Sequence, residues 1–178
     1  MKNSIFSIVI FFTIMYANNL SQPLKIGMEA PKWLFKDSDG KSFTMDDWKG
    51  KILQVNYVDP DESEMNEPFN DAVKKAIEVD SLISRKTFKG FGIVDCNSTW
   101  KPSFLVKTIA GRKAKKFNTT ILFDYDAELR KLWGLKKDSY NVVILDQNRI
   151  CRAIVRGKVS AEKQEELIQI IIDLQKDM

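Results

Sequence analysis

The side chains that could carry covalent chemistry are few, because the chain has two cysteines, Cys96 and Cys151, and no histidine. The absence of histidine excludes Ser-His-Asp and Cys-His nucleophile pairs and histidine-based zinc sites. Two cysteines this far apart in the sequence form neither a four-thiolate metal site nor a Cys-x-x-Cys redox pair. We therefore expect no metal and no cofactor, and Cys96 is the single candidate for a catalytic residue.

Cys96 directly follows an apolar run at residues 91–95, which is typical of a buried strand. Ligands gather at the carboxyl ends of parallel strands, so a lone thiol there could act on peroxides or disulfides. The alternative is a small buried apolar residue, since free cysteine is among the most buried residue types. Cys151 is expected at the opposite end of the sheet, beyond the limit of about 7 Å between the Cα atoms of a disulfide.

A dense acidic group, Asp59, Asp61, Glu62 and Glu64, follows the apolar run at residues 52–58. Oxygen ligands of this kind could bind a hard cation such as calcium, but their spacing fits no EF-hand loop. Carboxylates are also favoured at a helix N-terminus, where free N–H groups and the helix dipole attract negative charge. We interpret the group as the start of a helix.

Charge is distributed unevenly along the chain. Residues 59–80 carry a net charge of −6, and residues 85–116 carry +8. The basic run in the second segment predicts either a solvated helix face or a surface that docks an acidic partner or anionic headgroups. The residues of this possible docking surface are Lys107, Arg112, Lys113, Lys115 and Lys116.

The N-terminus resembles a secretory signal peptide, with a short basic start and an apolar run at residues 5–17. A membrane span needs about 20 apolar residues, so this run is too short to cross a bilayer. We expect residues 1–17 to be a signal peptide and the mature protein to be exported to a bacterial periplasm. Contact with a membrane is then expected only through the signal peptide, and no contact with nucleic acid is expected.

The remaining chain, residues 24–178, is the right size for one domain. Residue types and periodicity predict strands at 33–36, 42–44, 52–58, 91–96, 119–124, 141–146 and 150–155, and helices at 62–83, 102–117, 129–133 and from Ser160 onward. Pro68 lies inside the first helical pattern and predicts a kink or a later helix start. Strand–helix–strand crossovers imply parallel neighbours and the final hairpin an antiparallel pair. The fold class is therefore α/β, with a mixed central sheet flanked by helices.

Several short motifs carry a resemblance to known proteins. Ile26-Gly27-Met28-Glu29-Ala30-Pro31, Trp48-Lys49-Gly50-Lys51 and Leu132-Trp133-Gly134-Leu135 resemble segments of the thioredoxin-like superfamily. Residues 50–54, 142–146 and 157–162 resemble more closely the bacterial YtfJ-like family of exported, thioredoxin-like proteins of unknown activity. The resemblance covers residues 24–178 and implies a thioredoxin-like fold.

The redox residues of that superfamily are missing. With Pro68 taken as its helix-kinking proline, Pro60, Asp61, Glu62 and Ser63 stand where Cys-x-x-Cys would be. Tyr140 stands at the position of the superfamily's cis-proline, and a trans bond is expected because a non-proline cis bond costs ~3 kcal/mol. The resemblance implies a non-redox module that binds an envelope protein partner or a small ligand. The alternative is a single-cysteine thiol oxidoreductase or peroxidase that uses Cys96.

Overall fold

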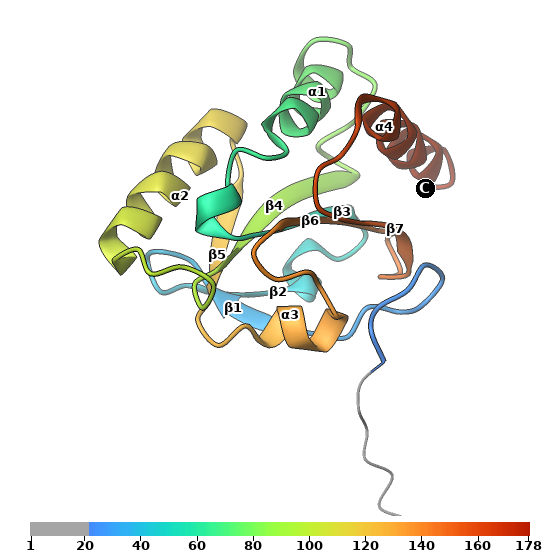
Figure 1. Cartoon of the computed structure of the whole chain (residues 1–178). Coiled ribbons are helices and arrows are strands. Elements are labelled where there is room, and N and C mark those ends of the chain that lie inside the picture. The colour runs from blue at the N-terminus through green and yellow to red at the C-terminus, as the bar shows by residue number, and fades with distance from the viewer. Residues whose placement is uncertain (1–21) are drawn as a thin grey trace, which may run out of the picture.

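Residues 22–178 form a seven-stranded mixed β-sheet in this computed structural model, and the predicted signal peptide at residues 1–17 lies outside the described part (Figure 1). The strands are β1 (Leu34–Lys36), β2 (Ser42–Thr44), β3 (Ile52–Val58), β4 (Phe88–Asp95), β5 (Thr120–Asp124), β6 (Tyr140–Leu145) and β7 (Cys151–Arg156). Their spatial order is β2-β1-β5-β4-β3-β6-β7. β3, β4 and β5 are parallel, and the other pairings are antiparallel. The predicted mixed sheet, with a βαβ unit and a C-terminal hairpin, is confirmed.

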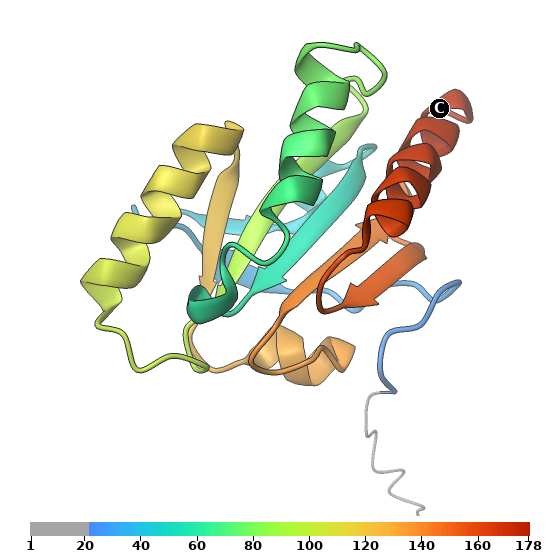
Figure 2. The ribbon, with the colours of Figure 1, turned by 45° about the horizontal axis from the view of Figure 1, so that its top comes forward.

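Helices cover both faces of this sheet. They are the 3₁₀ helices η1 (Met45–Trp48) and η2 (Pro60–Glu62), and the α-helices α1 (Glu67–Glu78), α2 (Ser103–Phe117), α3 (Glu128–Trp133) and α4 (Ala161–Lys176). The three long helices α1, α2 and α4 lie side by side on one face, and the short helix α3 lies on the other (Figure 2). Within residues 22–178, no helix is both long and apolar enough to cross a membrane.

The alternation of side chains along the central strands separates the core into layers. Leu53, Val55 and Tyr57 of β3 point to one face and pack with Leu129 and Trp133 of α3. On the opposite face of β3, Ile52 packs against α1 and α4. The next two residues on that face, Gln54 and Asn56, are polar and lie between α1 and α2.

The helix predicted at residues 62–83 is shorter at both ends, and the later start that Pro68 predicts is confirmed. α1 begins at Glu67, and Pro68 occupies its first turn, where a missing N–H costs no hydrogen bond. The helix ends at Glu78, and Ser81 then adopts a left-handed backbone conformation with φ 55°. β4 begins at Phe88 and not at residue 91, because β3 supplies partners from Ile52 onward.

Candidate functional site

The carboxyl ends of β3, β4 and β5 meet at one edge of the sheet, and the positions of the missing redox motif lie there. These positions are Pro60, Asp61 and Glu62, which form η2, and Ser63, which ends it. Tyr140 opens β6, the antiparallel neighbour of β3, through a trans peptide bond. The Asp59 N–H donates to the Ser139 carbonyl over 3.0 Å. The fold thus places η2 beside Tyr140.

Polar contacts tie η2 to the loop that follows β4. Asp59 caps η2 by accepting a hydrogen bond from the Asp61 N–H at 2.8 Å. The Asp61 carboxylate accepts a hydrogen bond from Thr99 Oγ1 at 2.9 Å and forms an ion pair with Lys101. Burial raises the pKa of Asp59. Within residues 22–178, no three metal-ligating side chains lie together in a way that could hold a metal ion. Asp59 instead caps η2, and Asp61 binds the loop that follows β4.

The thiol of Cys96 lies at the same edge but is poorly suited to nucleophilic chemistry. The backbone N–H of Cys96, which directly follows β4, donates to the Asp124 carbonyl at 2.9 Å. Burial, followed by the charges of Asp124 and Asp95, raises the pKa of the thiol to about 12. Because the thiolate is the reactive form, a thiol with this pKa is nearly inert at neutral pH. The alternative role of Cys96 as a redox thiol would therefore require this pKa to be lowered.

Cys151 lies at the other end of the sheet, as predicted. It opens β7 opposite Leu145, which pairs with Leu53 near the start of β3. Both cysteines are free. Burial raises the pKa of Cys151 to about 11.

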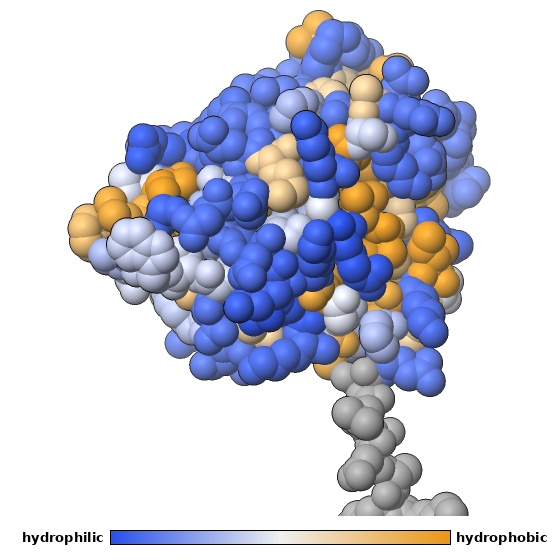
Figure 3. All heavy atoms as spheres, in the orientation of Figure 1, coloured by the Kyte–Doolittle hydropathy of each residue, from blue (hydrophilic) through white to orange (hydrophobic). Residues whose placement is uncertain are grey.

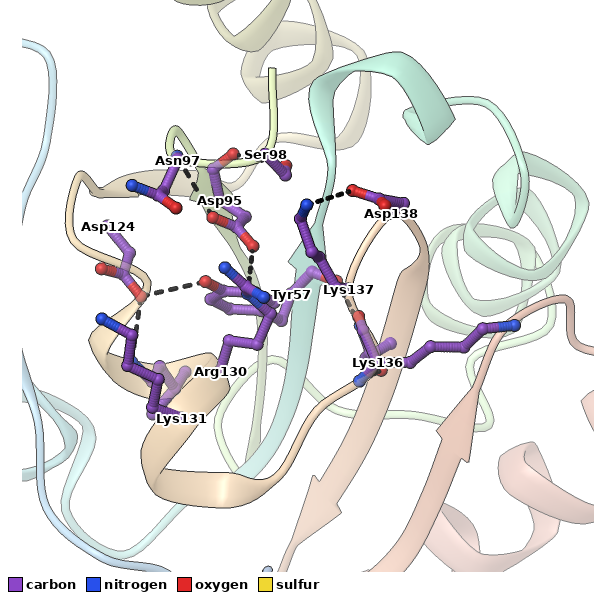
Figure 4. Close-up of polar contacts among 12 residues, drawn as sticks. Tyr57, Asp95, Asn97, Ser98, Asp124, Arg130, Lys131, Lys136, Lys137 and Asp138 are labelled. Carbon is purple, nitrogen blue, oxygen red and sulfur yellow. Dashed lines mark hydrogen bonds and ion pairs between the residues drawn. The ribbon is translucent and has the colours of Figure 1, made fainter.

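A buried polar network of Tyr57, Asp95, Asp124 and Arg130 lies at the carboxyl ends of the strands (Figure 4). The Tyr57 hydroxyl donates to Asp124 Oδ2 at 3.0 Å, and Asp124 also accepts hydrogen bonds from the N–H groups of Glu128 and Leu129, each at 2.9 Å. These bonds fix the first turn of α3 to the end of β5. The carboxylate of Asp124 therefore acts as a clamp between the sheet and the helix.

The second half of this network is an ion pair between Arg130 and Asp95. Arg130 Nε lies 2.8 Å from Asp95 Oδ2, without the alignment of a hydrogen bond. Burial raises the pKa of Asp95, and Arg130 partly offsets this effect. Burial and the charges of Asp124 and Asp95 also raise the pKa of Tyr57, so its hydroxyl stays a neutral donor. The network holds loops in place and presents no nucleophile. The sequence analysis did not predict it, although Asp95 and Asp124 each end an apolar strand.

A cavity of about 290 Å³ lies on the other face of the sheet, between α1 and α2. Gln54 and Asn56 of β3 lie on its floor, directly opposite Gly90 and Gly92 of β4. Because glycine has no side chain, these two positions leave open the space that core side chains would fill. The apolar walls are Val73 and Ile77 of α1 and Val106, Ile109, Ala110 and Phe117 of α2. The volume lies at the lower end of the range for small-molecule sites, about 300–1,000 Å³.

The polar floor of the cavity contains an unpaired acceptor. Gln54 is only 2% exposed, and its Nε2 donates to Asn56 Oδ1 at 3.1 Å and to Asn70 Oδ1 at 3.2 Å. Asn70 Nδ2 in turn donates to the Tyr140 hydroxyl at 2.8 Å. The Oε1 atom of Gln54 has no hydrogen-bond partner within residues 22–178. Leaving a buried acceptor unpaired costs about 1–3 kcal/mol, so this polar position lowers the stability of the folded state.

One end of the cavity reaches the positions of the missing redox motif and of the cis-proline, because Pro60, Ser63 and Tyr140 also line it. The sequence analysis did not predict that these positions line a cavity. A signal was present: Gln54 and Asn56 interrupt one face of an otherwise apolar strand, and Gly90 and Gly92 repeat at the same spacing.

The five residues of the possible docking surface do not form one free surface. Lys113 and Lys116 both pair with Glu67 of α1. The other three, Lys107, Arg112 and Lys115, are exposed on α2, and within residues 22–178 none of them forms an ion pair.

Apolar side chains are exposed next to these bases. Hydrophobic spheres stand at the left edge of Figure 3, over the amino-terminal end of α2. Phe104 is 67% exposed there, and Trp100, in the preceding loop, is 88% exposed. Trp33 and Trp133, by contrast, are buried.

Comparisons with known proteins agree with this geometry. Residues 34–176 match the model of a family described as a bacterial protein of unknown function, YtfJ_HI0045. No curated protein matches the chain in sequence.

Similar solved structures have the thioredoxin fold. The thioredoxin domain of a thiol-disulfide oxidoreductase from Bacteroides vulgatus matches with a TM-score of 0.60 and 15% identity, covering 83% of this chain and 99% of that one. A peroxiredoxin-like protein from Aquifex aeolicus matches with a TM-score of 0.59 and 12% identity, covering 87% and 90%. An exposed lipoprotein thioredoxin from Streptococcus pneumoniae matches with a TM-score of 0.57 and 14% identity, covering 79% and 99%. At these identities the similarity establishes the thioredoxin-like fold alone.

Proposed function

The chain belongs to the YtfJ_HI0045 family of bacterial proteins of unknown function, and we propose that it is an exported, non-redox module that binds a small ligand between α1 and α2. The observation that carries this proposal is the cavity over β3 and β4, whose floor is formed by Gln54, Asn56, Gly90 and Gly92 and whose walls are apolar. Export to the periplasm is part of the proposal and rests on the sequence of residues 1–17.

The non-redox part of the proposal rests on η2, at the carboxyl ends of the parallel strands, where redox-active proteins of this fold would have their cysteines. η2 has no cysteine, and the thiol of Cys96 has a pKa of about 12. A disulfide exchange reaction needs a reactive thiolate and a second thiol to resolve the mixed disulfide. A binding role needs neither, and the cavity offers apolar walls together with a few polar groups, as small-molecule sites commonly do.

A neutral apolar fluorophore, N-phenyl-1-naphthylamine, tests the proposal. We expect its emission to rise on binding to the purified protein, because transfer from water to an apolar site increases its quantum yield. Gly92→Val should abolish the rise: a Cβ at this position makes an ordinary van der Waals contact with Ile121 Cγ1 at 3.5 Å, and the added methyl groups would occupy the cavity that Gly92 lines.

The matched control is Gly111→Ala. Gly111 lies on α2 but does not line the cavity, and a Cβ there meets nothing within 4 Å. This variant should bind the fluorophore as the unmodified protein does. Binding that survives Gly92→Val unchanged would place the ligand elsewhere and contradict the proposal.

A protein partner is a second candidate, favoured by the exposed Trp100 and Phe104. Aromatic side chains are enriched at the centres of protein interfaces, and a basic rim steers association with acidic partners. Lys107 lies one helical turn from Phe104, on α2. This surface is distinct from the cavity floor, so the two roles do not exclude one another.

A further inference from the structure

We propose that the ligand of this cavity is an amphipathic anion, with its apolar body between α1 and α2 and its carboxylate or phosphate-type group beside Lys51 and Arg85. This inference rests on the proposed function and adds the chemical class of the ligand. It is carried by the charge of the cavity lining, by the position of the bases at one end, and by the apolar walls.

The charge of the lining is of one sign. Basic residues among the lining are Lys51, Lys74, Arg85, Lys89 and Lys113, and no aspartate or glutamate lines the cavity. A cationic ligand would meet repulsion without a counter-charge, whereas an anion would gain attraction strengthened by the low-dielectric surroundings.

The bases are not all equally available to a ligand. Lys113 pairs with Glu67, and Lys74 lies 3.9 Å from Glu78. Lys89 points to the other side of the sheet, where its Nζ lies 5.3 Å from the ring centroid of Trp48. Lys51 therefore remains as a lining base without an ion-pair partner within residues 22–178, and Arg85, which also pairs with Glu78, lies beside it.

Lys51 and Arg85 are held together at the amino-terminal end of the strands. Lys51 precedes β3, and its Nζ donates to the Arg85 carbonyl at 2.7 Å. Arg85 also bonds Glu78 at 2.8 Å, but Lys51 has no ion-pair partner within residues 22–178. Lys51 and Arg85 therefore bring two positive charges to this end of the cavity, and an anion there would be attracted by both.

The opposite end of the cavity is uncharged. Pro60, Ser63 and Tyr140 line it, and Gln54 and Asn56 lie between the two ends. β3 runs from Ile52 to Val58, and a strand rises about 3.3 Å per residue, so the lining spans roughly 20 Å. An elongated molecule with one charged end matches this distribution.

Three probes of equal chain length separate charge from hydrophobicity: decanoate, decanol and decyltrimethylammonium, measured by isothermal titration calorimetry. The two ions are kept below their critical micelle concentrations, and decanol is kept below its aqueous solubility. We expect decanoate to bind about tenfold more tightly than decanol, and decyltrimethylammonium to bind more weakly than decanol. A tenfold preference corresponds to one partly desolvated charge interaction of about 1.4 kcal/mol.

Variants then locate the charged group. Lys51→Gln and Arg85→Gln should each reduce the preference for decanoate over decanol severalfold, while the affinity for decanol stays the same. Lys86→Gln is the matched control, because Lys86 is an exposed neighbour that does not line the cavity. It should leave the preference unchanged.

The outcomes distinguish the two proposals. Equal binding of decanol and decanoate, abolished by Gly92→Val, would overturn the anion preference and leave the cavity as the binding site. A preference for decanoate that survives both Lys51→Gln and Arg85→Gln would overturn the placement of the head group. Failure of all three probes and of the neutral fluorophore to bind would overturn the proposed function as well.

Discussion

At the scale of single residues, Cys96 shows that a position at the functional edge of a fold does not make a side chain reactive. Its thiol is surrounded by the carboxylates of Asp95 and Asp124 and by apolar neighbours, and each of these disfavours a negative charge on sulfur. Lys107 has the opposite effect on the pKa but is the weakest of the four causes. The environment is the reverse of the electropositive one that activates catalytic cysteines.

Alkylation with iodoacetamide checks this environment in a Cys151→Ser background, where Cys96 is the single thiol of the chain. A pKa of about 12 in place of the ordinary 9.0 lowers the thiolate fraction at about pH 8 by roughly three orders of magnitude. The modification rate should therefore be far below that of free cysteine and should keep rising as the pH approaches about 12.

The thiol of Cys96 should not catalyse disulfide exchange. Reduction of a disulfide substrate with dithiothreitol as electron donor should proceed no faster than with dithiothreitol alone, for both the unmodified protein and Cys96→Ser. Turnover by the unmodified protein that Cys96→Ser lacks would restore the single-cysteine enzyme.

Gln54 shows why the candidate site was only partly predictable from residue types. The strand at residues 52–58 is apolar enough to predict its burial, and it is a central strand of the sheet. The sequence does not say that Gly90 lies opposite Gln54, because pairing between strands 36 residues apart in the chain depends on register. The cavity arises from that pairing, so it could not be read from either strand alone.

At the scale of elements, local residue chemistry predicted which segments form strands and helices better than where they end. Glycine and proline mark helix boundaries as expected, because Gly134 ends α3 and Pro102 directly precedes α2. The predicted overlong first helix failed because its apolar periodicity continues past Glu78, whereas Ser81 takes a left-handed conformation. Leu82, which lies within the predicted helix, is half-exposed. Long-range packing decided these boundaries.

One arginine joins elements that the sequence keeps far apart. The guanidinium of Arg149, in the turn of the β6–β7 hairpin, donates to the carbonyls of Met45 and Trp48 at 2.7 Å each and of Lys51 at 2.8 Å. It thereby ties the hairpin to η1 and to the start of β3. Its own backbone is left-handed, with φ 68°, which costs a non-glycine residue some stability.

Substitutions at this position separate the tie from the strain. Arg149→Lys keeps the charge but cannot reach three carbonyls with a rigid fork, so we expect a loss of about 2 kcal/mol in the free energy of unfolding, measured by urea denaturation. Arg149→Gly relieves the left-handed strain but removes every bond, and we expect it to lose more than Arg149→Lys. Greater stability of Arg149→Gly than of the unmodified protein would mean that strain outweighs the tie.

At the scale of the whole molecule, the two oppositely charged segments of the sequence face one another. Asp61, Glu67 and Asp71 from the acidic segment pair with Lys101, Lys113 and Lys116 from the basic segment. The sequence predicted the uneven charge but not this pairing, because the α1–α2 neighbourhood follows from the parallel crossover of β3, β4 and β5. The pairs of Glu67 and Asp71 join α1 to α2, the two helices that enclose the cavity.

Glu67 is central to this bridge, because its carboxylate meets both Lys113, at 3.1 Å, and Lys116. The two lysines lower the pKa of Glu67 below its ordinary 4.5. A depressed carboxyl pKa stabilises the folded state above the ordinary pKa, and this contribution is lost as the pH falls through the folded value. Glu64 is the matched control, since it is exposed and forms no ion pair within residues 22–178.

We therefore expect Glu67→Gln to lower the free energy of unfolding by about 1 kcal/mol near pH 7 in dilute buffer, a typical value for a partly exposed charge network. The difference from the unmodified protein should shrink in about 1 M salt, where charges are screened beyond about 3 Å, and also below the ordinary pKa of the carboxyl. Glu64→Gln should change stability little under either condition. Because the lost pairs join α1 to α2, Glu67→Gln should also loosen the walls of the cavity and weaken binding of N-phenyl-1-naphthylamine, which Glu64→Gln should not do. A Glu67→Gln variant that matches Glu64→Gln in both stability and binding would show that the facing charges are neighbours without energetic coupling.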